Sequence, residues 1–307
     1  MRSSNVLDIM MPFYGDIRFF KLAVESVLRQ SDPNWRLVIV DDLYPDPAAG
    51  EWAASLDDVR VHYRRNKKNL GVSGNFARCV DLAESAFMVI MGCDDLLLPN
   101  YVERVQSLIG DFPDVSYVQP GVQVIDENGV ATTPLPDLIK RFYRPRVSGP
   151  DVLSGERLAL SLLRGNWTYF PSIAWRTSII KEIGFRPDLD VVLDLALQLR
   201  IVSENGSLVV DKAETSYAYR RHAGSVSSWT AGDGTRFSEE AIYFMEVAAT
   251  MRDLGWVRAS RAARWHVSSR LNELASVPRA MRGAGARSAL GLAVHAMSPR
   301  AGGPWSR

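Results

Sequence analysis

Five consecutive apolar residues, Phe87 to Met91, lead into two adjacent carboxylates, Asp94 and Asp95. A short run that is apolar at every position predicts a strand buried on both faces, as in a parallel sheet. Pro99 marks the expected start of the next helix. Ligands of open α/β sheets bind just beyond the carboxyl ends of the strands, where a pair of carboxylates is able to hold a hard divalent cation. The alternative is that one aspartate only caps the following helix.

The first 120 residues alternate between strand and helix patterns. Strands are predicted at residues 6–11, 35–40, 59–63, 87–91 and 115–119, and helices at residues 19–28, 71–83 and 101–109. This alternation predicts a parallel sheet with right-handed crossovers. The first strand ends at Pro12 and Tyr14 and the second at Asp41 and Asp42, so these loops are expected to cluster with the acidic pair at one edge of the sheet.

The pattern is less regular after residue 120. Residues 128–129, Asn-Gly, predict a hairpin that follows residues 122–125. Residues 131–150, rich in Pro and Arg, predict a long loop. The remaining predicted elements are a helix whose last residues are 158–163, a strand at 169–175, and helices at 177–183, 191–202, 237–254 and 256–274. Between Gly255 and the end of the chain, nine arginines accompany a single acid, Glu273.

Composition narrows the class of protein. The chain is 47% hydrophobic and 23% charged with a formal net charge of +1, which is ordinary for a soluble protein and gives no drive toward nucleic acid. Cys79 and Cys93 form neither a disulfide framework nor a zinc motif, so reduced thiols in the cytoplasm are expected. No signal peptide and no apolar stretch of about 20 residues is recognisable.

Five segments in order resemble the family 2 glycosyltransferases, nucleotide-sugar enzymes with the GT-A fold: residues 9–14, 23–30, 38–42, 69–75 and 94–99. The resemblance implies an α/β fold with a Rossmann-like, mostly parallel central sheet and flanking helices. It also implies a division into a nucleotide-sugar-binding half at residues 1–115, an acceptor-binding and catalytic half of the same domain at 116–230, and a C-terminal helical, basic extension at 231–307.

The resemblance assigns the donor side of the site. Asp42 is expected to accept a hydrogen bond from the nucleobase imide, with Pro12 and Tyr14 beside the base. Asn69 and Gly71 belong to the family's loop-to-helix entry beside the sugar nucleotide, where glycine allows close approach of the backbone and a helix N-terminus favours phosphate. The alternatives are that Asp42 is a turn residue and that this segment only begins a helix.

The resemblance also implies a divalent cation, Mn²⁺ or Mg²⁺, at the acidic pair. Asp94 matches the last acid of the family's DxD motif, whereas Gly92 replaces the first acid, so Asp94 is the expected main protein ligand. Asp95 is expected near the donor sugar. His222 lies in a segment that resembles the family's C-terminal His segment near the metal and the diphosphate; a lone His is otherwise more often structural.

On the acceptor side, Asp194 resembles the leading Asp of the family's helix that carries the catalytic base, although Leu195 and Ala196 depart from the family pattern. Asp190 is the competing candidate, and capping of the helix is the alternative role. The resemblance places three further residues on the acceptor side, although core packing is commoner for tryptophan: Trp167, Trp175 and Arg176.

The expected function is therefore inverting transfer of a sugar from a nucleotide-diphosphate sugar to a hydroxyl of a sugar, glycolipid or lipid-linked acceptor, in synthesis of a bacterial cell-surface polysaccharide or glycolipid. A metal-dependent nucleotidyltransferase and a non-catalytic nucleotide-sugar-binding module are the alternatives. The basic C-terminus suggests that the protein is cytoplasmic and contacts the inner face of the plasma membrane peripherally. The alternative is that these basic residues only form a solvated surface.

Overall fold

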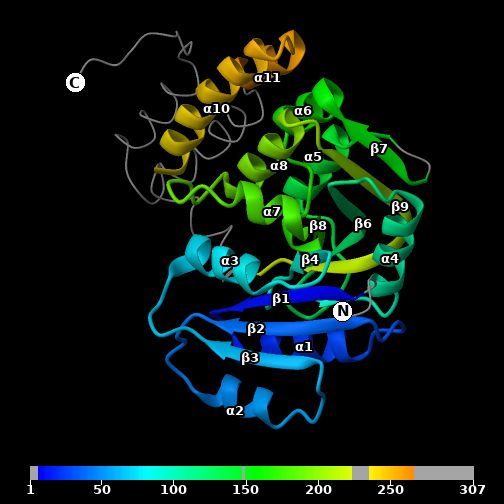
Figure 1. Cartoon of the computed structure of the whole chain (residues 1–307), viewed down its shortest axis with the longest axis vertical. Helices are drawn as coiled ribbons and strands as arrows, with labels where there is room; N and C mark the ends of the chain where they lie inside the picture. The colour runs from blue at the N-terminus through cyan, green and yellow to red at the C-terminus, as the bar shows by residue number, and fades with distance from the viewer. Residues whose placement is uncertain (1–5, 147–148, 223–234, 266–307) are drawn as a thin grey trace.

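The computed structural model describes residues 6–146, 149–222 and 235–265 of the 307-residue chain. Within these ranges one sheet of nine strands runs through the molecule in the order β3-β2-β1-β4-β8-β6-β9-β5, and β7 pairs with β9 (Figure 1). Its strands are β1 (Leu7–Phe13), β2 (Trp35–Asp41), β3 (Val61–Arg65), β4 (Phe87–Ile90), β5 (Leu96–Leu97), β6 (Tyr117–Ile125), β7 (Asp151–Ser154), β8 (Ala174–Arg176) and β9 (Ser207–Arg220).

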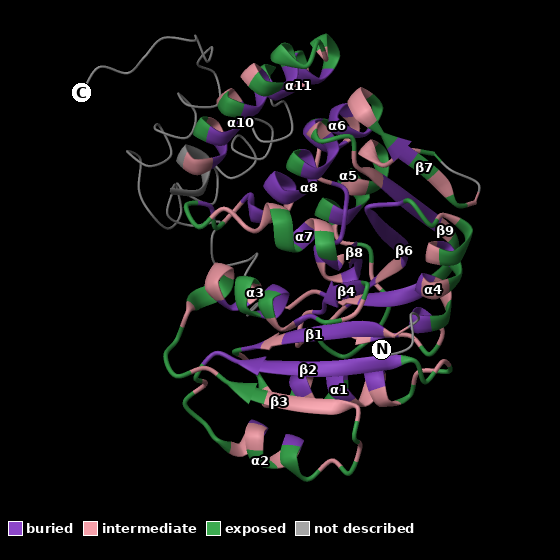
Figure 2. Ribbon diagram, viewed as in Figure 1, coloured by how far each residue is buried: buried purple, intermediate pink, exposed green. Residues whose placement is uncertain are grey.

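The first half of the sheet is parallel across β3, β2, β1 and β4. Every residue of β2 and β4 is buried, and Figure 2 shows β1 and β2 buried along almost their whole length while β3 is only partly buried. Side chains alternate between two apolar clusters, so that Met10 belongs to one and Ile9 and Met11 to the other. The central strands are therefore covered on both faces, as their continuous apolar sequence predicts.

The second half of the sheet is mixed. β8 lies antiparallel to both β4 and β6, whereas β9 runs parallel to β6. Directly after the acidic pair, β5 pairs with the last part of β9, with Leu96 opposite Ala218. This pairing brings the end of β9 to the carboxyl end of β4, although the two are more than 100 residues apart in the chain.

Helices cover the sheet on both faces. They are α1 (Ile17–Leu28), α2 (Ala48–Ala54), α3 (Gly71–Leu82), α4 (Tyr101–Asp111), α5 (Leu135–Tyr143), α6 (Gly155–Arg164), α7 (Thr177–Ile183), α8 (Leu193–Ser203), α10 (Thr235–Asp253) and α11 (Val257–Trp265), with a 3₁₀ turn at Phe170–Ser172. Figure 1 shows α10 and α11 beyond α6 and α8, at the end of the molecule opposite α2. None of the described helices is long and apolar enough to cross a bilayer.

The α/β fold is confirmed, and so are the predicted strands that became β1, β2, β3 and β4. The prediction of a long loop over residues 131–150 is wrong in part, because α5 occupies its middle and β7 begins at Asp151. The expected break between residues 119 and 122 is also absent, since β6 runs through both predicted strands before the turn at Asp126. The strand expected at 169–175 is a 3₁₀ turn followed by β8. Residues 266–307 of the basic extension lie outside the described residues.

Candidate active site

Asp42 closes the carboxyl end of β2 and is almost fully buried, at 2% exposed. Its Oδ1 accepts hydrogen bonds from the Leu70 backbone N–H (2.8 Å) and the Asn66 side chain (2.9 Å), and its Oδ2 accepts from the Gly71 N–H (2.9 Å). Asn69 in turn donates to the Asp42 carbonyl oxygen at 3.1 Å. Asp42 thus holds the start of α3 against the sheet, and one lone pair of Oδ2 remains for a further donor.

The loop after β1 lies between Asp42 and the acidic pair. The Asp42 N–H donates to the Phe13 carbonyl oxygen at 3.0 Å, and a Cβ on Gly15 would lie 3.7 Å from Cys93 Sγ. Tyr14, between them, is 54% exposed, and its ring meets that of Tyr44 edge-on with centroids 5.3 Å apart. Pro12 is half-buried in β1. The ends of β2, β1 and β4 therefore meet at one edge, as the sequence predicts.

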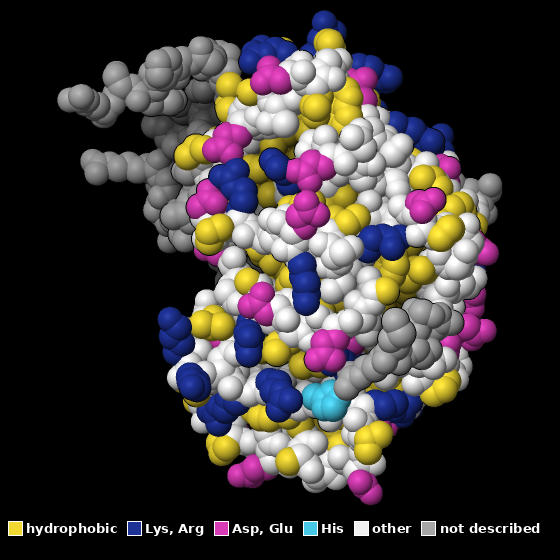
Figure 3. Space-filling view, in the orientation of Figure 1, with side chains coloured by type: hydrophobic (Ala, Val, Ile, Leu, Met, Phe, Trp, Pro, Cys, Tyr) yellow, Lys and Arg dark blue, Asp and Glu magenta, His cyan; other side chains and the backbone are white. Residues whose placement is uncertain are grey.

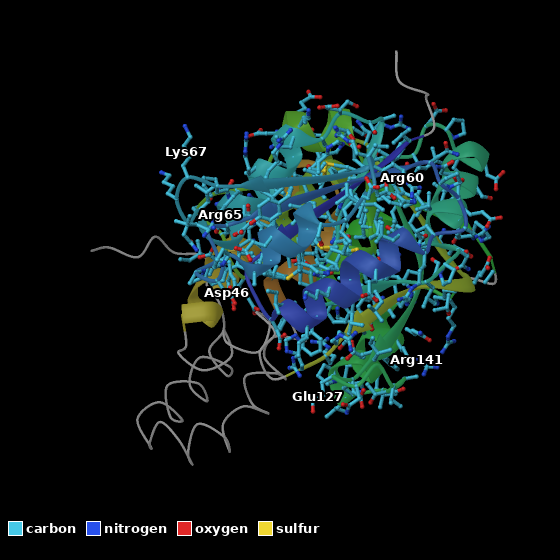
Figure 4. All side chains as sticks on the ribbon, turned by 90° about the horizontal axis from the view of Figure 1, so that it is seen from below. Asp46, Arg60, Arg65, Lys67, Glu127 and Arg141 are labelled. Carbon is cyan, nitrogen blue, oxygen red and sulfur yellow. The ribbon has the colours of Figure 1, made fainter. Side chains whose placement is uncertain are left out.

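Figure 3 shows Lys and Arg side chains gathered over the end of β3 and the segment that joins it to α3. The exposed basic residues here are Arg64 and Arg65 at the end of β3, and Lys67 and Lys68 in the segment that follows it. In Figure 4 the side chains of Arg65 and Lys67 lie at the periphery of the molecule. Of these four described side chains, that of Arg65 folds back onto the protein and donates to the Tyr44 carbonyl oxygen at 2.7 Å.

Asp94 and Asp95 differ in environment although they are adjacent. The Asp94 side chain is 30% exposed, and its Oδ2 lies 2.8 Å from His222 Nε2. Asp95 is 1% exposed and accepts from Tyr217 Oη (2.8 Å) and the Arg220 N–H (2.7 Å). Burial, and then the charge of Asp94, raise the pKa of the Asp95 carboxyl well above its ordinary value. Asp94 therefore faces the site, whereas Asp95 fastens the end of β9.

The end of β9 carries three consecutive polar side chains into the site. Arg220 donates to the Asp94 carbonyl oxygen at 2.7 Å, which ties the strand end to the acidic pair. Arg221 forms a two-pronged contact with Asp137 of α5, at 3.1 and 3.2 Å. His222 packs against Phe19, with ring centroids 4.9 Å apart, and reaches Asp94. Asp95 thus positions His222 by holding the strand that precedes it.

Asp194 lies in the first turn of α8 and is half-buried. Its Oδ2 accepts from the Asn166 amide at 2.9 Å and its Oδ1 from the Leu195 N–H at 2.7 Å. Asp190 is exposed, and the backbone amides that begin with its own N–H donate to the Glu239 carboxylate of α10 at 2.8 to 3.2 Å. The carboxylate that accepts hydrogen bonds from these amides is therefore that of Glu239 and not that of Asp190 or Asp194.

A hydrogen-bonded network from α5 joins the two ends of the site. Tyr169 Oη donates to Asp137 at 2.9 Å, and Lys140 Nζ donates to the Thr168 carbonyl oxygen at 2.8 Å. Thr168 Oγ1 donates to Asn166 Oδ1 at 2.7 Å, and Asn166 holds Asp194. Burial, and then the charge of Arg221, lower the pKa of the Lys140 ammonium to about 8, against the opposing charges of Asp194 and Asp137. Arg221 bonds to Asp137 and is followed in the chain by His222, so these hydrogen bonds, together with the chain links between neighbouring residues, lead from the acidic pair to Asp194.

The chain matches the model of glycosyl transferase family 2 over residues 8–158, which include β1 to β4, the acidic pair and α5. It belongs to this family. Its fold resembles Staphylococcus aureus TarS residues 1–349, solved in complex with UDP-GlcNAc, with a TM-score of 0.64 at 12% identity over 94% of this chain and 90% of that one. The likeness shows the GT-A glycosyltransferase fold.

The names of two Escherichia coli relatives state an activity. The putative colanic acid biosynthesis glycosyl transferase WcaA is 25% identical over 214 residues, 67% of this chain and 69% of that protein. WfgD, named as a UDP-Glc:alpha-D-GlcNAc-diphosphoundecaprenol beta-1,3-glucosyltransferase, is 23% identical over 125 residues, 41% of this chain and 49% of that protein. This family 2 member is thus a glycosyltransferase similar to enzymes of bacterial polysaccharide synthesis.

The side chains at the acidic pair are better suited to a cation that binds together with a substrate than to an ion that the protein alone holds. Within the described ranges no cluster of three or more His, Cys, Asp or Glu side chains is arranged as a metal site. Asp94 Oδ2 and His222 Nε2 are 2.8 Å apart, close to the ~3 Å between adjacent ligands of an octahedral ion with bonds of about 2.1 Å. Mg²⁺ is commonly held by one or two protein ligands together with substrate phosphates and water.

The predicted acceptor-side residues lie elsewhere. Trp167 and Trp175 are fully buried in the core, where the Trp175 ring stacks on Tyr117 with centroids 4.9 Å apart. Arg176 pairs with Phe87, at the amino end of β4, and donates to the Val115 carbonyl oxygen at 3.0 Å. The structure does not bring Trp175 and Arg176 together with the acidic pair. A cavity of about 500 Å³ between α7, α8 and α10 is likewise separate, and none of the predicted site residues lines it.

Sequence reasoning missed the residues that α5 and the end of β9 contribute: Asp137, Lys140, Arg220 and Arg221. The helical spacing of Leu135, Leu138, Ile139 and Phe142 was the available signal for α5, but Pro134 just before it and Pro136 in its first turn favoured a loop. Asp137 also has a local signal, because an acid in the first turn is typical of a helix start.

Gly92 has a structural role that the family's usual acid would not allow. A Cβ at this position would lie 2.6 Å from Asp95 Oδ2 and 2.9 Å from Asp94 Oδ1. Gly92→Ala should therefore displace both carboxylates, lowering the free energy of unfolding by about 1–3 kcal/mol and lowering glycosyltransferase activity. Thermal unfolding and titration of activity with Mn²⁺ measure these effects. Gly110→Ala in α4, where a Cβ meets nothing within 4 Å, is the control; equal behaviour of the two variants would contradict the assignment.

Proposed function

We propose that this glycosyltransferase inverts the configuration of the transferred sugar, moving it from a nucleotide-diphosphate donor to a hydroxyl group with Asp194 as the general base. The observation that supports the proposal is the series of hydrogen bonds through α5 that, with short chain links, leads from Asp94 to Asp194. It favours one site in which Asp194 would remove a proton and the acidic pair would face a cation and the diphosphate.

Asp194 is suited to remove a proton because its two oxygens each accept one fixed hydrogen bond and keep a free lone pair. The Asn166 amide orients the carboxylate, and a positioned base of this kind contributes typically about 10²–10⁴-fold to a rate. The acceptor oxygen then attacks the anomeric carbon as the bond to the diphosphate breaks, so the sugar changes configuration once. Asp190, with its side chain exposed, remains the less favoured candidate.

The donor would lie along the ends of β1, β2 and β4. We assign the nucleobase to the free lone pair of Asp42 Oδ2 and to the exposed Tyr14 ring, with Pro12, Asn69 and Gly71 beside it. Asp94 and His222 would hold a divalent cation, Mn²⁺ or Mg²⁺, which neutralises charge on the diphosphate when bound. The basic side chains of Arg220 and Arg221 add positive charge at the same place. Asp95 acts by keeping the end of β9 in position.

The acceptor is proposed to be a sugar, glycolipid or lipid-linked saccharide, in line with the names of WcaA and WfgD. A cytoplasmic site of action follows from this proposal. A contact of the basic C-terminus with the inner membrane face also stays a proposal, since residues 266–307 lie outside the described part of the chain.

The test combines binding and product analysis. The full chain is screened by thermal shift against UDP, TDP, GDP and their sugars, with and without Mn²⁺, because a ligand that binds only the folded state raises its stability. Donors that bind are then incubated with saccharide and lipid-linked acceptors. Release of nucleoside diphosphate with a new glycoside supports the proposal. Release of pyrophosphate would instead indicate a nucleotidyltransferase, and binding without turnover over the panel would indicate a non-catalytic module.

A further inference from the structure

The outer face of α5 exposes an apolar stripe. Leu135, Leu138, Ile139 and Phe142 are 69%, 47%, 48% and 84% exposed, respectively. Their spacing of three, one and three residues places them on one face of the helix. Single exposed apolar side chains are ordinary on protein surfaces, but a contiguous patch of large ones marks an interaction site.

The inner face of the same helix is firmly held, so the stripe has a fixed orientation. Asp137 is 2% exposed and bonded to Arg221 and Tyr169. Lys140 bonds to the Thr168 carbonyl oxygen and lies over the Tyr169 ring, 4.4 Å from its centroid. These contacts set which side of α5 faces the protein, and the apolar stripe is on the other side.

A cluster of cations borders the stripe. Arg141 and Arg146 are exposed, and neither makes an ion pair with another described residue. Arg144 and Lys212 lie beside them, and Lys212 Nζ donates to the Pro145 carbonyl oxygen at 2.7 Å. Partial burial, and then the charges of Arg144 and Arg141, lower the pKa of Lys212, which shows that these cations are close in space. Figure 4 shows Arg141 at the periphery of the molecule.

The combination is that of an interfacial helix, in which an apolar face enters the boundary between headgroups and acyl chains while cations contact anionic lipid. We propose that α5 docks this glycosyltransferase onto an anionic bilayer and that its acceptor is an amphiphile anchored in that bilayer. Arg141 and Arg146 would meet lipid phosphates, and Leu138 and Phe142 would enter the bilayer. The acceptor part of this inference rests on the proposed function; the docking part does not.

The position of α5 explains why docking would serve transfer. Its inner face belongs to the network that ends at Asp194, and an α-helix with its side chains is only about 10–12 Å across. A bilayer against the outer face of α5 therefore lies about one helix diameter from Asp137 and Lys140, which face the active site from the inner side of this helix. A hydroxyl near a lipid headgroup would reach the base without leaving the membrane surface.

The docking test is flotation of the full chain with vesicles of phosphatidylglycerol and phosphatidylethanolamine, compared with vesicles of phosphatidylcholine alone. The intact protein should bind the anionic vesicles, less strongly at high salt. Leu138→Ser with Phe142→Ser should weaken that binding by at least about tenfold. Val59→Ser with Ile242→Ser, which alters residues 92% and 65% exposed on other elements, is the matched control and should bind unchanged.

No binding of the intact protein to anionic vesicles, or equal binding by the two double variants, would overturn the proposal. The proposal would also be overturned if the apolar stripe joined two copies of the chain. The intact protein would then be a dimer that does not bind vesicles, and the α5 variant, but not the control variant, would be a monomer. A thermal shift with the best-binding nucleoside diphosphate checks that the α5 variant still folds and binds nucleotide.

The acceptor is tested with radiolabelled donors and bacterial membranes. Label should enter the organic-solvent-extractable lipid fraction with the intact protein and should fall with the α5 variant. Label that enters only water-soluble products, at equal rates for both proteins, would overturn the acceptor assignment. Vesicle binding with no transfer of label to any fraction would contradict the proposed function and not the docking.

Discussion

Asp194→Asn should lower the rate of sugar transfer by at least about 10²-fold while nucleotide binding changes by less than about twofold. The amide keeps the shape of the side chain and its place in the first turn of α8, but it is unable to take a proton from the acceptor. Loss of a general base costs typically about 10²–10⁴-fold. Initial rates at saturating donor and acceptor, together with a nucleotide thermal shift, give the two numbers.

The matched control is Asp190→Asn. Asp190 lies four residues earlier, with an exposed side chain, and its contact with Glu239 is made by the backbone N–H. This substitution should leave the transfer rate nearly unchanged. The opposite pattern, with an active Asp194→Asn and an inactive Asp190→Asn protein, would move the base to Asp190.

Asp8→Ala should lower the free energy of unfolding by about 3–5 kcal/mol. Asp8 is fully buried in β1 and binds Arg36 of β2 through two hydrogen bonds of 2.7 and 2.8 Å. It also accepts from the backbone amides of Glu84 and Ser85, just before β4. Removing the carboxylate leaves the Arg36 guanidinium without its buried partner. It also removes the contact that joins β1, β2 and the residues just before β4. Denaturant unfolding followed by circular dichroism measures the loss.

The same pair predicts a pH dependence. Burial alone would raise the pKa of Asp8, but hydrogen bonds from Arg36 and from the Ser85 and Glu84 amides outweigh it and lower the pKa. A carboxyl with a lowered folded pKa stabilises the protein above its unfolded pKa, about 3.9, and loses that contribution as the pH falls below it. As the pH is lowered through this range, the free energy of unfolding should therefore fall less steeply for Asp8→Ala than for the intact protein.

The control for Asp8 is Glu25→Ala. Glu25 pairs with Arg29 on the surface of α1, with side chains 40% and 72% exposed, so its removal should cost less than about 1 kcal/mol. If Asp8→Ala were as mild as Glu25→Ala, the buried pair would not be holding β1, β2 and β4 together.

The first half of the fold, from β1 to β4, was predictable because its signals are local. β1, β2 and β4 are mostly apolar, and each of the loops after them begins with polar or turn-forming residues, so the convergence of Asp42 and Asp94 followed from sheet geometry. The partners of these residues did not follow. Asp8 pairs with Arg36 across the β1–β2 register, 28 residues away, and nothing in its neighbourhood in the sequence marks that pairing.

The second half was harder because its elements depend on distant contacts. The inner face of α5 is anchored by Asp137, which binds Arg221, 84 residues later in the chain. β9 owes the position of its end to Asp95, 125 residues before Arg220. The prediction that Asp194 is the base had a family pattern behind it, whereas nothing in the sequence marked Asn166, 28 residues earlier, as the residue that orients it. The resemblance placed Trp167 and Trp175 on the acceptor side, with core packing as the commoner role of tryptophan, and their burial puts them in the core.

The central claim, one site that inverts a sugar through the acidic pair and Asp194, is tested most directly by the configuration of the first product. A donor found by the thermal-shift screen is incubated with its acceptor, and the anomeric proton of the new glycoside is followed by NMR from the first minutes. The account predicts a single product whose anomeric configuration is opposite to that of the donor, and its absence with Asp194→Asn. A product that retains the donor configuration, or one formed at the normal rate by Asp194→Asn, would contradict it.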